Sequence, residues 1–176
     1  MFNNKKKFLW LVTMLQLINE TKTDYLTNLP NRKAFDEDII SRIDKLKKNK
    51  IPALQLIVID LKNLKKINDN EGMEAGDKII IKMALILANL TSQFERQAYR
   101  IGGDEFAILQ NNFLHKNYMH MHSFCKAISK VPHYTGWSWI KNNSDIEAAE
   151  SKTIATKMFN DASKQISTLK SDAWRM

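Results

Sequence analysis

Two acidic residues that are far apart in the sequence, Asp60 and Asp104, could together bind a divalent cation. Asp60 ends an apolar run, and Asp104 stands in a turn with Gly102 and Gly103 between two further apolar runs. Carboxylates held close together repel each other unless they are solvated or bridged by a cation, and oxygen ligands suit magnesium. Glycines in the turn would let a nucleotide approach bare backbone. The pattern alone leaves a plain hairpin turn with exposed acids as an equal alternative.

The apolar patterns beside these acids predict the strands that would position them. Residues 54–59 form a nearly unbroken apolar run, as expected for a strand covered on both faces. Residues 98–101 and 106–109 predict the two strands of a hairpin around the glycine turn. If the hairpin lies beside the first strand in one sheet, Asp60 and Asp104 converge on one edge of that sheet.

Helical periodicity accounts for most of the remaining chain. Helices are predicted over 32–46, 77–90 and 118–130, and a further strand over 134–140. One or two helices are expected in the tail after a capping box at 144–147. Strands and helices therefore alternate around a central antiparallel pair, which predicts an α+β fold with one sheet and helices packed on it.

The length and composition indicate one domain. The chain has 176 residues, 44% of them hydrophobic, and no linker-like segment divides it. We expect a domain over 23–176 preceded by a lead-in segment over 1–22. The apolar stretch 8–18 predicts an amphipathic helix that could pair two copies, with a membrane-surface or partner-binding segment as the alternative. Because it is shorter than the roughly 20 residues that cross a bilayer, no membrane span is expected.

Charge and cysteine content restrict the partners and the compartment. The formal net charge of +8 favours a polyanionic partner, such as a nucleotide, a nucleic acid or an acidic surface. The lysine runs lack the interleaved aromatic residues of a nucleic-acid groove, so nucleic acid is not expected. The single cysteine, Cys125, excludes an internal disulfide, favours the cytoplasm and is expected in the core.

Three separated blocks resemble the signature blocks of GGDEF-domain diguanylate cyclases. They are Asp24-Tyr25-Leu26-Thr27-Asn28-Leu29-Pro30-Asn31-Arg32, the stretch from Asp60 to Asp77, and the stretch from Arg100 to Phe106. Their order and spacing match the family over roughly residues 23–170. The resemblance implies a palm-like fold, shared with nucleotidyl cyclases and polymerases, and condensation of two GTP molecules into cyclic di-GMP with release of pyrophosphate.

The resemblance also implies a role for each matching residue. Asp60 and Asp104, with the backbone carbonyl of Leu61, would hold two Mg²⁺ or Mn²⁺ ions, and Glu105 would help the attacking hydroxyl lose its proton. The substrate-binding set would comprise Asn68 and Asp77 at the guanine edge, the amides of Asn63 and Leu64 with Lys65 at the phosphates, Gly102 and Gly103 at the turn, and Lys170. Without the resemblance, Asp77 and Asn68 are a helix cap and a turn asparagine. Because each domain would bind one GTP, turnover would require a homodimer.

The chain departs from the family at several positions. Lys62 stands where the family usually has a second acid, and it could either steady the triphosphate or weaken metal binding. Residues 93–96 lack the Arg-x-x-Asp motif, so product inhibition by that route is not expected. The family pattern in the tail is also incomplete. These departures leave a second interpretation, a catalytically weak or inactive domain that binds GTP or a partner.

Overall fold

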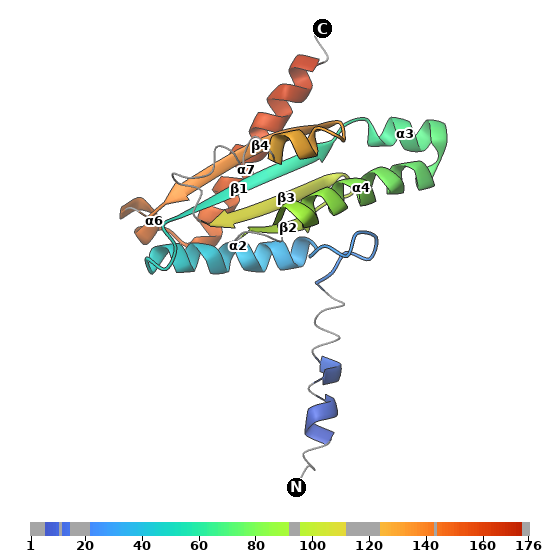
Figure 1. Cartoon of the computed structure of the whole chain (residues 1–176). Helices are drawn as coiled ribbons and strands as arrows, with labels where there is room; N and C mark the ends of the chain where they lie inside the picture. The colour runs from blue at the N-terminus through green and yellow to red at the C-terminus, as the bar shows by residue number, and fades with distance from the viewer. Residues whose placement is uncertain are drawn as a thin grey trace.

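The protein folds as one antiparallel sheet with helices on both faces (Figure 1). The computed structural model describes residues 6–10, 12–14, 22–91, 96–111, 124–142 and 144–173. The named elements are α2 (Arg32–Lys47), β1 (Ala53–Leu61), α3 (Leu64–Glu71), α4 (Met73–Thr91), β2 (Arg96–Arg100), β3 (Glu105–Asn111), β4 (His133–Lys141), α6 (Ser144–Ala148) and α7 (Ser151–Ala173). Residues 124–128 are also helical. The predicted α+β fold is therefore confirmed.

The sheet has the strand order β2-β3-β1-β4, and every neighbouring pair is antiparallel. Strand β1 is buried along its whole length because it is central and covered on both faces. Its side chains alternate between two cores: Leu56 packs with residues of α2 and α7, whereas Ile57 packs with residues of α4. The predicted strand at 54–59 and the hairpin around the glycine turn are both present, with β1 paired to β3.

Helix α3 was not predicted, and α4 begins earlier than predicted. Asn63 precedes α3 in the left-handed conformation, with φ of 60°, and Gly72 ends the helix with φ of 88°. Glycine adopts this positive φ without a steric cost, so a new helix begins directly at Met73. Asp77 consequently lies in the second turn of α4, and its predicted place at the start of that helix is wrong.

The expectation for Cys125 is also wrong, because its side chain is exposed. Its neighbours Phe124 and Ile128 are buried against the sheet, while Cys125 lies on the other side of this helical turn. The predicted helix over 118–130 is described only from residue 124 onward. In the lead-in segment, residues 6–10 and 12–14 are helical, and the rest of the predicted helix at 8–18 lies outside the described residues.

Candidate active site at the glycine turn

The acids selected from the sequence gather where the β1 strand meets the glycine turn. Asp60 is directly opposite Glu105 in the register of β1 and β3, and the backbone N–H of Leu61 donates to the carbonyl oxygen of Asp104 at 3.0 Å. Asp60 is only 5% exposed. Burial raises the pKa of Glu105, and the nearby charges of Asp60 and Asp104 raise it further. The fold therefore brings three carboxylates close enough for the charges of Asp60 and Asp104 to act on Glu105.

Lys170 supplies a positive charge to this cluster from the last turn of α7. Its ammonium nitrogen lies 2.6 Å from Oδ2 of Asp60. Partial burial lowers the pKa of Lys170, but the hydrogen bond and charge of Asp60, with the charges of Asp104 and Glu105, outweigh this and raise it. Lys170 reaches the site because α7 packs closely on β4: a Cβ atom added to Gly136 would lie 1.9 Å from the carbonyl oxygen of Ala162.

The residues present fit a divalent cation in charge and donor type. The three carboxylates outnumber the two cations that act on Glu105, Lys170 and Arg32, and the donors are oxygen atoms, as Mg²⁺ and Mn²⁺ prefer. Within the described residues, no three or more His, Cys, Asp or Glu side chains form a group that could hold a metal ion. The residues that could hold a cation are the two acids that the sequence selected, Asp60 and Asp104, with the backbone carbonyl of Leu61.

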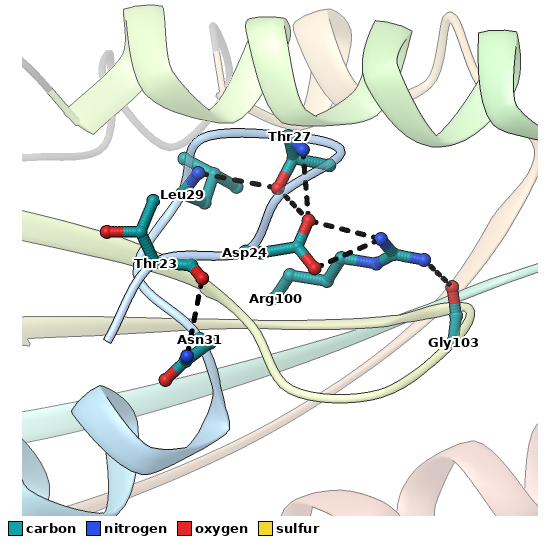
Figure 2. Close-up of polar contacts among 7 residues, drawn as sticks. All are labelled: Thr23, Asp24, Thr27, Leu29, Asn31, Arg100 and Gly103. Atoms are coloured by element: carbon teal, nitrogen blue, oxygen red, sulfur yellow. Dashed lines mark hydrogen bonds and ion pairs between the residues drawn. The ribbon is translucent and has the colours of Figure 1, made fainter. Parts of the chain in front are cut away.

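An ion pair anchors the glycine turn to the first signature block. Figure 2 shows the guanidinium of Arg100 between the carboxylate of Asp24 and the carbonyl oxygen of Gly103. The Arg100–Asp24 contacts are 3.1 and 3.2 Å, and the contact to Gly103 is 2.8 Å. Asp24 also accepts hydrogen bonds from the backbone and side chain of Thr27. The sequence placed Asp24 and Arg100 in matching blocks but did not indicate that they pair.

Gly102 and Gly103 matter because they carry no side chain, and not because their backbone takes a conformation that only glycine adopts. Neither Gly102 nor Gly103 has a positive φ. A Cβ atom at Gly103 would meet nothing within 4 Å, whereas one at Gly102 would lie 2.6 Å from a carboxylate oxygen of Glu105. Gly103 therefore presents open backbone, and Gly102 leaves room for the Glu105 side chain.

Asn68 and Asp77 come from the neighbouring helices α3 and α4. The side-chain oxygen of Asn68 is buried and has no hydrogen-bond partner in the described structure. It fits against Gly76, where an added Cβ atom would lie 1.9 Å from this oxygen. Asp77, which follows Gly76, is partly exposed. An unpaired buried oxygen costs free energy unless a ligand or water satisfies it, so Asn68 is poised to accept a hydrogen bond.

The three residues that the resemblance places at the phosphates, Asn63, Leu64 and Lys65, lie at the beginning of α3. Asn63 and Lys65 are exposed, and Leu64 is the first residue of the helix. Amides in the first turn of a helix have no acceptor within the helix, and they favour anions. Lys62, just before them, directs its ammonium group to the ring of Tyr134, 4.2 Å from the ring centroid. The sequence did not indicate a role for Tyr134.

A separate apolar pocket of about 740 Å³ lies on the sheet face shared by β1 and β4. Trp137 and Trp139 line it and are 49% and 46% exposed. Exposed aromatic side chains of this size are typical of surfaces that another chain or segment covers.

Two further expectations concern a membrane span and the Arg-x-x-Asp motif. In the described part of the chain, no helix is both long and apolar enough to cross a bilayer. The exposed side chains of the first helical turns include Phe8, Leu9 and Trp10. The position at which the Arg-x-x-Asp motif is missing, 93–96, lies outside the described residues except for Arg96.

A protein family and several solved structures match this chain. The family described as diguanylate cyclase, GGDEF domain, matches residues 21–168, and the chain belongs to that family. Among solved structures, the coiled coil and GGDEF domain of DgcB from Caulobacter crescentus in complex with c-di-GMP has a TM-score of 0.70 at 20% identity, with 89% of this chain and 86% of that chain covered. Diguanylate cyclase SiaD in complex with its activator SiaC from Pseudomonas aeruginosa has a TM-score of 0.67 at 17% identity, with 96% and 65% covered. At these identities the similarity establishes the fold alone.

The curated relatives are longer proteins. An uncharacterized membrane protein of Staphylococcus haemolyticus is 36% identical over 107 residues, which are 60% of this chain and 29% of that protein. An uncharacterized membrane protein of Staphylococcus aureus strain USA300 is 33% identical over 96 residues, 54% of this chain and 26% of that protein. The chain therefore spans less than a third of the length of these relatives.

Proposed function

We propose that this chain is a diguanylate cyclase that condenses two GTP molecules into cyclic di-GMP and releases pyrophosphate. The observation that carries the proposal is the cluster of Asp60, Asp104 and Glu105 at an open glycine turn. Membership of the GGDEF family supports it. Bound Mg²⁺ or Mn²⁺ would neutralise charge that develops on the transferring phosphoryl group.

The protein residues then have separate tasks. Asp60 and Asp104 hold the cations, and Glu105, whose pKa is raised, is suited to accept a proton from the attacking 3′-hydroxyl. Lys170 and Lys65 attract the phosphates. The unpaired oxygen of Asn68, together with Asp77, accepts hydrogen bonds from guanine, so that the wrong base leaves buried polar groups unpaired.

Dimerisation is part of the proposal, because each domain binds one GTP and two must meet. The exposed apolar residues Phe8, Leu9 and Trp10 are our candidates for bringing two copies together. The rate per molecule is then expected to rise with protein concentration in the range where dimers form. Sedimentation velocity with and without residues 1–20 measures that association directly. We propose a cytoplasmic location for the domain, where GTP is available.

The second candidate is a GTP-binding or partner-binding module without turnover. It is favoured by the ammonium group of Lys170 at Asp60 and by the exposed tryptophans of β4. In this case the site would hold the nucleotide but not complete the transfer.

One experiment separates the two candidates. The purified protein is incubated with GTP and Mg²⁺, the products are resolved by mass spectrometry, and GTP binding is measured in parallel. Asp104→Ala is expected to reduce cyclic di-GMP formation by roughly 100-fold or more, because it removes a cation ligand. Asp161→Ala, which changes an exposed acid on α7, is the matched control and keeps activity. GTP binding without product would favour the second candidate, and absence of both would contradict the two together.

A further inference from the structure

Lys62 brings a positive charge to the edge of the sheet where the acids gather. It follows Asp60 by two residues and lies one residue beyond the end of β1. An ammonium group at this position has the length to reach the Asp60 carboxylate. A lysine on that carboxylate would oppose binding of a divalent cation.

The structure gives Lys62 a different partner. Its ammonium nitrogen lies 4.2 Å from the centroid of the Tyr134 ring, while the ion pair with Asp60 is made by Lys170. The face of an aromatic ring attracts a cation electrostatically. Tyr134 is directly opposite Asp60 in the register of β1 and β4, so the ring stands next to the acid.

The backbone and the core hold this arrangement in place. The N–H of Lys62 donates to the carbonyl oxygen of Pro132 at 3.0 Å, which fixes position 62 against the chain entering β4. Tyr134 packs against the core beneath α7, so its ring has a defined position. The ammonium nitrogen of Lys170 lies 5.9 Å from the centroid of the same ring. Tyr134 therefore lies close to both ammonium groups at this edge of the sheet.

We propose that Tyr134 is a positioning residue: its ring binds the ammonium group of Lys62 and keeps this second charge off Asp60, so that a divalent cation competes with Lys170 for the carboxylate but not with Lys62. This inference rests on the proposed function in one respect, that Asp60 is a cation ligand. It also decides the question that the sequence left open at Lys62, because a lysine held on Tyr134 does not compete for the site.

The test measures Mn²⁺ binding to the full chain without nucleotide, by electron paramagnetic resonance of the free ion. Tyr134→Met, which removes the ring but keeps an apolar side chain, is expected to raise the Kd for Mn²⁺ about fivefold. Tyr134→Phe keeps the ring and is expected to bind as the natural sequence does. Adding Lys62→Ala to Tyr134→Met is expected to restore the original Kd, since the released charge is gone.

A matched control exists on the same strand. The ammonium nitrogen of Lys141 lies 5.5 Å from the ring centroid of Trp139, and Trp139 is opposite Gln55, five residues along β1 from Asp60. Trp139→Met therefore removes a similar lysine–ring contact away from the acids, and it is expected to leave the Kd for Mn²⁺ unchanged.

The outcomes distinguish this inference from the proposed function. An unchanged Kd in Tyr134→Met, or a weakening that persists in the double variant, overturns the positioning role alone. If Mn²⁺ does not bind, or binds equally well to Asp60→Asn, both proposals fall. Should Tyr134→Met not fold, the contact is measured in the natural sequence by NMR after ¹³C-methylation of its lysines. A ring-current shift of the Lys62 signal, assigned by its loss in Lys62→Arg, supports the inference, and an unshifted signal overturns it.

Discussion

The ammonium nitrogen of Lys170 lies 2.6 Å from Oδ2 of Asp60, and this ion pair joins the last turn of α7 to the end of β1. A lysine on a proposed cation ligand has two opposite consequences. It pairs with the carboxylate when no metal is bound, and under the proposed function it contacts a phosphate of the nucleotide.

Lys170→Met is expected to change cation binding and nucleotide binding in opposite directions. Mn²⁺ alone should bind about threefold more tightly, because a competing charge has been removed from Asp60. GTP should bind about tenfold more weakly, because a charge-assisted contact to phosphate is lost. Isothermal titration calorimetry measures both. Lys164→Met removes an exposed lysine from the same helix and should change neither; a parallel loss of both affinities would point to misfolding instead.

Glu105→Gln is expected to stabilise the metal-free protein at neutral pH. Burial and the charges of Asp60 and Asp104 raise the pKa of Glu105 above 4.5, so stability is lost as the pH rises from 4.5, and the full cost is reached above the folded-state pKa. Below pH 4.5, where Glu105 is protonated in both states, the cost disappears. Thermal melts in EDTA should show a rise of about 2 °C at pH 7.5 and none near pH 4. Mn²⁺ should reduce the difference, and Glu150→Gln, an exposed glutamate, should show no such pattern.

The effects of substituting Asp24 and Arg100 on the free energy of unfolding are expected to be strongly non-additive. The two side chains are 15% and 11% exposed, so Arg100→Met leaves a largely buried carboxylate unpaired and should lower the free energy of unfolding by about 2–3 kcal/mol. Burial raises the pKa of Asp24, but the hydrogen bonds from Thr27 and Arg100 and the charge of Arg100 lower it overall. The contribution of Asp24 is therefore present above pH 3.8 and lost as the pH falls through its folded-state pKa.

Urea unfolding of Asp24→Asn, Arg100→Met and the double variant measures this coupling. If the effects of the two single variants simply add, the pair does not act as a unit. Glu37→Gln, which breaks the exposed ion pair with Lys22, is the comparison and should change stability little.

Two glycine substitutions are expected to separate ligand effects from fold effects. Gly103→Ala adds a methyl group where nothing lies within 4 Å, so the free energy of unfolding should change by less than about 0.5 kcal/mol while GTP affinity falls. Gly136→Ala places its methyl group 1.9 Å from the Ala162 carbonyl oxygen and should destabilise the protein by about 2 kcal/mol or more. Retained GTP affinity in Gly103→Ala would contradict a nucleotide lying against the turn.

The sequence by itself determined the elements whose signals are local. The apolar run at 54–59, the glycine-centred hairpin and the helix from Arg32 have a periodicity or a turn composition that few alternatives share, and the structure contains all three. The family blocks likewise selected the acids and Asn68 as site residues by their spacing, and this selection stays a prediction. Helix α3 escaped prediction because it is only 8 residues long and starts after a left-handed Asn63, which no periodicity indicates.

Only the tertiary structure determined which partner each charged side chain contacts. Lys170 pairs with Asp60 because α7 docks on β4 at Gly136, and Lys62 binds Tyr134 because the strand order places β4 beside β1. Arg100 reaches Asp24, across 76 residues of chain, because the backbone N–H of Arg100 donates to the carbonyl oxygen of Pro30 and so holds the first signature block beside the end of β2. Such contacts depend on which surfaces pack together, and local sequence patterns specify the surfaces without specifying their partners.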